Sequence, residues 1–385
     1  MTNVKPPGHT AAHAHHKPPL LGERLVERLG ALIARDPDSI GADCARAELA
    51  CYETRQGQYE KAAALLDALR RKHEAKPHPA ISTWLSLADG LMSHFTDAGV
   101  SSRDKMRRAH ALSAAGRLMP LHALSAAWLA HMDYTRLDVD AMASHLSQAL
   151  HLAEPDHHAA RSRANLVAAQ ALHLAGRLDL ALPWYQRART HANAEGDDAT
   201  ISAVMFNMAS IRATNLRQVA FTGEGNAMDG VYALLSADAT SSFDARTGAA
   251  SAMPLHALLR AQILALQGDA AQALLAYEAH LASAQRPLRL QCAHLADQAW
   301  CRSQMGQMDS ARGDALAAEA SLTSESQLDD SAATHSRCAQ VFEALGDTAQ
   351  ADRHRVLAAA LWHDYRTLQA RIVAAVGRLS PNGSS

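Results

Sequence analysis

The sequence predicts an all-α protein, a stack of about eight helical hairpins with no sheet. Apolar residues recur every three or four positions along most of the chain, as on one face of an amphipathic helix. Glycine stands where several of these stripes end, and no segment shows alternating β-branched residues. Apolar residues make up 48% of the chain but aromatic residues only 4%, so the core is built from Ala and Leu. The clearest turn glycines are Gly57, Gly176, Gly268, Gly306 and Gly346.

The clearest hairpin runs from Asn165 to Ala188. Its first half carries an apolar stripe spaced by three, and Gly176 ends that helix because glycine adopts a left-handed conformation without steric cost. A second stripe follows directly, so two short helices fold back on each other. The two stripes are Leu166, Ala169 and Leu172, then Leu178, Ala181, Leu182, Tyr185 and Ala188.

This hairpin resembles the tetratricopeptide repeat (TPR) family, whose signature has small residues, a turn glycine and an aromatic residue at fixed positions. Asn165 stands where the family usually has Trp, but the other signature positions match. The resemblance implies a right-handed α-α superhelix, an α-solenoid, and the same frame recurs around the other glycines, with further turns expected near Gly99, Leu137 and Gly223. The matching residues are Ala169, Gly176, Ala181, Tyr185 and Ala188.

The repeat domain is expected to span residues 20–379, between a disordered His/Pro-rich tail at 1–19 and a disordered tail at 380–385. A first helix at 20–35 covers the start of the stack. The fifth hairpin is irregular, with a helix at 228–236 followed by a polar loop at 237–247.

Two further local features are expected from the sequence. The connection after the central hairpin is expected over His191 to Asp198. Asp329 and Asp330 are expected to cap a helix that begins near Ser331.

Composition indicates a cytoplasmic protein that binds neither nucleic acid nor membrane. The formal charge is −2, no run of 18 apolar residues occurs, and the N-terminus has no apolar signal-peptide core. The five cysteines form no CxxC pair, so we expect reduced and mostly buried thiols.

Motif searches predict neither an enzyme nor a cofactor or metal site. No phosphate-binding loop, GxGxxG, GxSxG or HExxH pattern occurs. His9, His13, His15 and His16 lie in the N-terminal tail, where weak metal binding is the alternative to a solvated segment.

In TPR folds the first helix of each hairpin lines a concave groove, which the resemblance carries over to this chain. Glutamine recurs at one groove position, and its amide both donates and accepts hydrogen bonds, so it suits the backbone of an extended peptide. The expected partner-binding residues are Arg163, Leu166, Gln170, His173, Leu258, Gln262, Trp300, Gln340 and Glu343.

The last helix, at 351–379, carries a heptad stripe, which supports either a coiled-coil homodimer or a cap over the final hairpin. The stripe leaves both alternatives open. Its residues are Leu361, Tyr365, Leu368, Ile372, Ala375 and Leu379.

The leading functional expectation is a protein-protein interaction module whose concave groove binds a peptide segment of a partner. The alternative is a stand-alone signalling or regulatory sensor that acts on a separate effector, because the layout is similar to the TPR regions of bacterial diguanylate cyclases and transcription regulators. Neither reading names the partner or the pathway.

Overall fold

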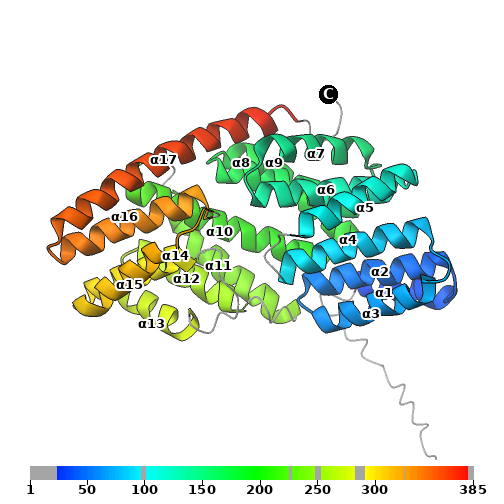
Figure 1. Ribbon diagram of the computed structural model, residues 1–385, viewed down its shortest axis with the longest axis horizontal. Coiled ribbons are helices and arrows are strands. Elements are labelled where there is room, and N and C mark those ends of the chain that lie inside the picture. Colours follow the sequence, from blue (N-terminus) through cyan, green and yellow to red (C-terminus); the bar gives the residue numbers. More distant parts are fainter. Residues whose placement is uncertain are drawn as a thin grey trace, which may run out of the picture.

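The computed structural model describes residues 24–96, 101–224, 228–247, 253–281, 291–324 and 326–379. Every regular element in these ranges is an α-helix, which confirms the all-α class (Figure 1). The predicted tails and the turn at Gly99 lie outside the described residues. The helices are α1 (Arg24–Arg35), α2 (Ile40–Arg55), α3 (Tyr59–His73), α4 (Pro79–Thr96), α5 (Ser102–Ala115), α6 (Met119–Thr135), α7 (Val139–Leu152), α8 (His158–Leu174), α9 (Leu178–Glu195), α10 (Asp198–Thr222), α11 (Met228–Thr247), α12 (Met253–Leu266), α13 (Ala270–His280), α14 (Gln291–Gln304), α15 (Met308–Ala320), α16 (Leu328–Ala344) and α17 (Thr348–Val376).

Local chemistry sets most helix ends as predicted. The five turn glycines all adopt positive φ, between 72° and 89°, and so does Gly223. The turn expected near Leu137 is also present, with Leu137 itself at φ 57°. Aspartates cap the helices that follow several of these turns; Asp269 and Asp347, for example, each accept a bond from the backbone N–H three residues later.

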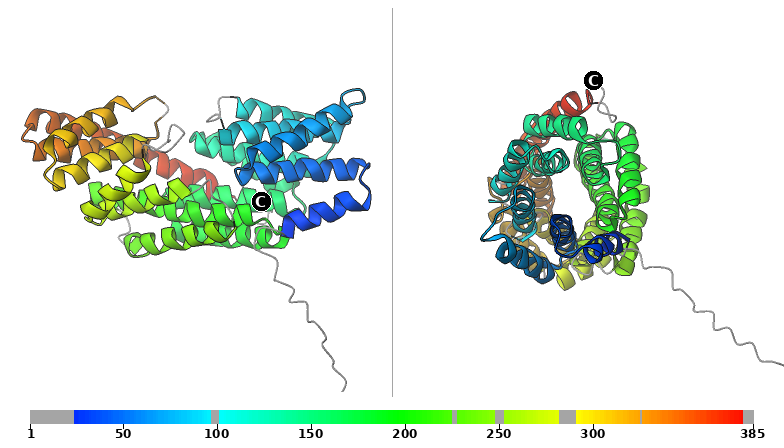
Figure 2. Two further views of the ribbon diagram at one scale, coloured as in Figure 1. Left: turned by 90° about the horizontal axis from the view of Figure 1, so that it is seen from below. Right: turned by 90° about the vertical axis from the view of Figure 1, so that its right-hand side faces the viewer.

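The helices pack in a regular sequence. Each of the pairs α2–α3, α4–α5, α6–α7, α8–α9, α10–α11, α12–α13, α14–α15 and α16–α17 is in contact along the chain. The first helix of each pair also contacts the first helix of the next, from α2 through α16. Seen end-on, the helices surround the long axis of the molecule (Figure 2, right).

Helices that lie far apart in the sequence also contact one another. The C-terminal helix α17 returns to the middle of the chain and packs on α7 and α8, while α10 contacts α16. One apolar cluster therefore joins residues of α6–α10 to α16 and α17. At the other end, α1 and α2 are bonded to the α9–α10 connection.

A buried ion pair joins α10 to α16. Arg217 is 1% exposed and donates to Asp330 at 2.7 Å and to Asp329 at 3.4 Å. The expected helix cap at Ser331 is therefore wrong: α16 begins at Leu328 and its first-turn carboxylates serve a guanidinium from another hairpin. Burial of Arg217 is the physical reason, since a buried charge needs a partner.

The polar loop expected at 237–247 is also wrong, because α11 continues to Thr247. Within this stretch, Asp244 contacts other helices and Thr240 bonds within α11. Asp244 accepts from Ser202 of α10 at 2.5 Å and lies 2.7 Å from His256 of α12, while Thr240 bonds back to Ser236. Similarly, α9 runs on to Glu195, so the connection expected over 191–198 shortens to 196–197.

Candidate partner-binding site

A groove of about 380 Å³ lies between the end of α10, α16 and α17. This volume falls within the range of ligand-binding clefts. Its lining mixes small apolar residues, two aromatic rings and charged residues at the edges. The lining residues are Ala220, Phe221, Thr222, Glu224, Ser336, Ala339, Gln340, Glu343, Arg355, Ala358, Ala359, Trp362 and Arg366.

Aromatic rings form the apolar part of the groove. Trp362 is 3% exposed, and its ring centroid lies 6.4 Å from that of Phe221. The indole Nε1 donates to the Ser336 hydroxyl at 3.1 Å, so the polar edge of the ring is already satisfied. The alanines that line the groove beside these rings are Ala339, Ala358 and Ala359.

Gln340 lines the groove, and a neighbouring arginine fixes the position of its side chain. Arg337 donates to its Oε1 at 2.9 Å, and the same guanidinium is anchored to Asp297 at 2.7 Å. Arg337 also lies over the rings of Trp300 and Phe221, at 4.2 and 5.1 Å from their centroids. Since the oxygen of Gln340 is engaged, its amide nitrogen is left to donate, and no described residue accepts from it.

Ion pairs occupy the edges of the groove. Glu343 lies 2.7 Å from Arg355, and Arg366 lies 3.3 Å from Glu224. All four side chains are at least 39% exposed, so each pair contributes little to stability and stays open to exchange with a partner's charges.

The structure brings only part of the sequence-derived site together. Gln340 and Glu343 line the groove, and Trp300 supports it from behind through Arg337. The other positions expected to face an open groove are almost fully enclosed, because α10 and α17 pack on α8, and α10, α11 and α14 pack on α12. Leu166, Gln170, His173, Leu258 and Gln262 are each at most 3% exposed.

His173 illustrates this enclosure. Its Nδ1 lies 3.2 Å from the Tyr185 hydroxyl, and Asn215 of α10 donates to its carbonyl oxygen. Burial lowers the pKa of His173 to about 3, with a smaller contribution from Arg212, so the ring is neutral at physiological pH. A partner cannot reach this side chain in the structure.

The heptad stripe of α17 is directed toward the same chain. Tyr365, Leu368 and Ile372 are at most 5% exposed, and Leu361 and Leu379 pack at the edge of the same cluster. The Tyr365 hydroxyl donates to the carbonyl oxygen of Leu174 at 3.2 Å. The stripe therefore packs on α7 and α8 of its own chain, and not over the final hairpin as the capping alternative expected.

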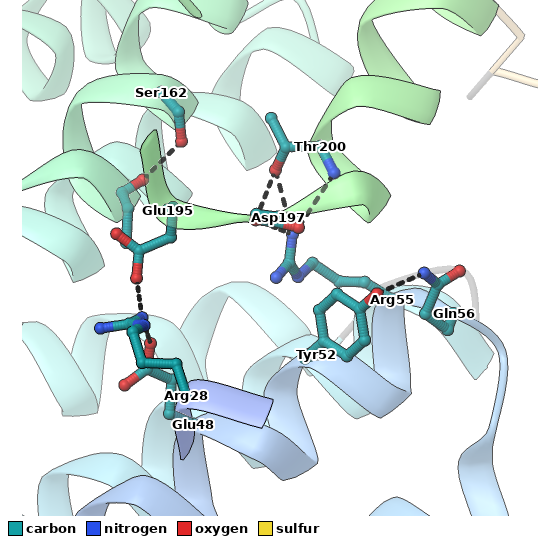
Figure 3. Close-up of polar contacts among 10 residues, drawn as sticks. Arg28, Glu48, Tyr52, Arg55, Gln56, Ser162, Glu195, Asp197 and Thr200 are labelled. Atoms are coloured by element: carbon teal, nitrogen blue, oxygen red, sulfur yellow. Dashed lines mark hydrogen bonds and ion pairs between the residues drawn. The ribbon is translucent and has the colours of Figure 1, made fainter. Parts of the chain in front are cut away.

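A second polar cluster joins the first helices to the α9–α10 connection (Figure 3). Arg55 of α2 pairs with Asp197 at 2.7 Å and bonds the Thr200 hydroxyl at 3.0 Å. Arg28 of α1 is shared between Glu195 and Glu48. Burial and the neighbouring Glu195 raise the pKa of Glu48 to about 7, against the opposing effect of Arg28.

This cluster borders a small cavity that Arg163 lines. The sequence places Arg163 on the concave face, but the structure separates it from the groove at α16 and α17, since the two sites share no lining residue. The expected single site is therefore divided into two.

The described residues contain no group of three or more side chains suited to hold a metal ion. The five cysteines are free thiols, and all but Cys44 are buried. Among the described helices, none has both the length and the apolar character required to cross a bilayer. The histidines of the N-terminal tail lie outside the described residues.

Comparisons with known proteins add no family assignment. No protein-family model matches the chain, and a search of curated proteins finds no similar sequence.

Proposed function

We propose that the chain is a protein-interaction module, a TPR-like array of eight hairpins that binds a peptide segment of a partner protein in the groove at α16 and α17. The positive-φ turn glycines and the packing of first helix on first helix support the TPR-like, superhelical reading. The groove carries the functional part of the proposal, because it combines an apolar floor with an oriented amide donor.

The occupant is an extended peptide with one large apolar side chain. That side chain would lie on Trp362 and Phe221, in the space that Ala358 and Ala359 leave. The Gln340 amide would donate to a backbone carbonyl of the peptide, so this contact would not depend on the peptide's side chains. Charged residues on either side of the apolar one would meet the exposed ion pairs at the edges.

Replacing Gln340 with alanine is expected to weaken peptide binding about five- to tenfold, the effect of losing one hydrogen bond of about 1 kcal/mol. The measurement is calorimetric affinity for peptides selected from a random library against the full chain. Gln304→Ala is the matched control, since Gln304 is exposed at the end of α14 and outside the groove. Equal affinities for the two variants would refute the role of Gln340.

Among the glutamines at this repeat position, Gln340 is the one suited to replacement, because it is exposed. Gln170 and Gln262 occupy the equivalent sequence position but are 2% and 3% exposed, so their replacement would disturb the interior. A chain ending near residue 350 would likewise lose α17, whose apolar stripe belongs to the largest core cluster. Single replacements at exposed groove residues avoid both problems.

The second candidate is a stand-alone regulatory sensor that acts on a separate effector. A sensor needs a site for its signal, and the cavity at Arg163 is the feature that favours this candidate.

A further inference from the structure

The cavity at Arg163 is small and partly open to solvent. It measures about 40 Å³ and lies where α1, α2, α4, α6 and α8 meet the α9–α10 connection. Since one water needs about 10–15 Å³ by this measure, the space equals roughly three waters. Its lining is Leu25, Glu48, Cys51, Arg55, Trp84, Leu87, Leu91, Leu124, Trp128, Ala159, Arg163, Glu195, Asp197 and Thr200.

Arg163 is a buried cation that lacks a counter-ion. Its side chain is 6% exposed, and none of the described carboxylates lies within ion-pair distance of it. It also forms no hydrogen bond with a described residue. Burial and then the neighbouring Arg55 lower the pKa of Arg163 to about 9, with Asp197 opposing, so the guanidinium is charged at neutral pH.

The other charges around the cavity are already paired with one another. Asp197 is engaged by Arg55 and by Thr200, while Glu195 and Glu48 share Arg28. These acids are therefore committed to cations on α1 and α2. Arg163 is the cation of this set that has none of the described carboxylates within ion-pair distance, and the donors of a largely buried guanidinium favour an acceptor.

The position of the guanidinium suits a planar anion. Its central carbon lies 4.0 Å from the Trp128 ring centroid, so the ring contacts the face of the guanidinium. The N–H donors lie in the guanidinium plane and point outward from its edges, where stacking does not engage them. A carboxylate accepts two such parallel bonds in the fork geometry that arginine presents.

We propose that this cavity binds a small free carboxylate of about formate or acetate size, with its oxygens on Arg163 and any methyl group against Trp84 and Leu87. The site is separate from the peptide groove, so this inference does not rest on the proposed function.

Calorimetric titration of the full chain with sodium acetate and sodium formate at pH 7 tests this proposal, with sodium chloride holding ionic strength constant. Saturable binding of at least one of the two acids is expected. Arg163→Met should lose at least about tenfold in affinity, since methionine matches the length of arginine but brings no donor. Arg189→Met is the control, because Arg189 is exposed on α9 and remote from the cavity lining.

Thermal unfolding gives a second readout. Acetate should raise the melting temperature of the wild type and of Arg163→Lys, which keeps the charge, but not that of a folded Arg163→Met. Sulfate, a tetrahedral anion, should leave the wild type unchanged. The proposal is overturned if neither acid binds saturably, if sulfate binds as tightly as acetate, or if the two acids bind Arg163→Met and the wild type alike.

Discussion

Replacing Arg217 with alanine is expected to lower the free energy of unfolding by about 3–5 kcal/mol. The guanidinium is 1% exposed and lies between the carboxylates of Asp329 and Asp330, which are 4% and 0% exposed. Its removal leaves two buried negative charges without their cation, and breaks the ion pair between α10 and α16. Chemical denaturation followed by circular dichroism measures the loss.

Two comparisons separate the buried pair from a general arginine effect. Arg312→Ala removes an exposed pair with Asp347 at 3.3 Å and should cost at most about 1 kcal/mol. The triple variant Arg217→Met, Asp329→Asn, Asp330→Asn removes all three charges and should be more stable than Arg217→Ala. A loss below about 1 kcal/mol for Arg217→Ala would show that the ion pair does not hold α10 to α16.

Mild acid is expected to destabilise the protein strongly, with the loss falling between pH 6.5 and about pH 4. Histidines at three sites form close pairs. His335 and His354 lie 2.8 Å apart through their Nδ1 atoms, and His158 and His191 lie 3.0 Å apart in the same way. Burial and the partner ring lower the pKa of both His335 and His191 to about 4.

The third pair is His110 and His122, whose Nε2 atoms lie 3.2 Å apart. Burial, then His122 and His145, lower the pKa of His110 to about 4. Because the unfolded chain binds these protons near pH 6.5 and the folded protein only near pH 4, stability rises with pH across that window. This contribution to the free energy of unfolding is fully present above pH 6.5 and is lost as the pH falls from 6.5 to about 4.

Each pair is partly solvated, so we expect about 1 kcal/mol per pair and about 3 kcal/mol from the three pairs together, less than the shifts alone would imply. His173, with a pKa of about 3, adds to the loss over the same window, whereas Glu48, with a pKa raised to about 7, opposes it. Denaturation at pH 7.5 and pH 4.5 measures the difference. His335→Asn should reduce it, whereas replacing the exposed His363 should not. Carboxylates with lowered pKa, such as Asp43, act only below this window. Equal stability at the two pH values would contradict the prediction.

Sequence patterns predicted the parts of the fold that local chemistry controls. Turn glycines such as Gly176 and Gly346 mark the ends of helices because positive φ is a property of the residue itself. The region 237–247 was misassigned because its helix depends on contacts of Asp244 with Ser202 and His256, which lie on other helices. Periodicity along the chain contains no signal for such contacts.

The candidate site was likewise predicted only in part. Gln340 was expected to face the groove from its place in the repeat, and it does line the groove. Gln170 holds the equivalent place but is buried, because α10 and α17 pack on its helix. Phe221 and Trp362 were missed since they meet only when α17 packs against the end of α10. Arg163 was found by position alone, and its missing counter-ion is visible only after folding.

A pair of tryptophan replacements on α17 tests the proposed groove most directly. Ala359 lines the groove and is exposed, while its neighbour Ala360 is exposed but lies outside the lining. Both substitutions carry the same small helix-propensity cost of about 0.5 kcal/mol, so a difference in binding reports the groove itself. We predict that library-selected peptides bind Ala360→Trp as they bind the wild type and lose at least about tenfold in affinity for Ala359→Trp. Equal affinity for both variants would contradict the account.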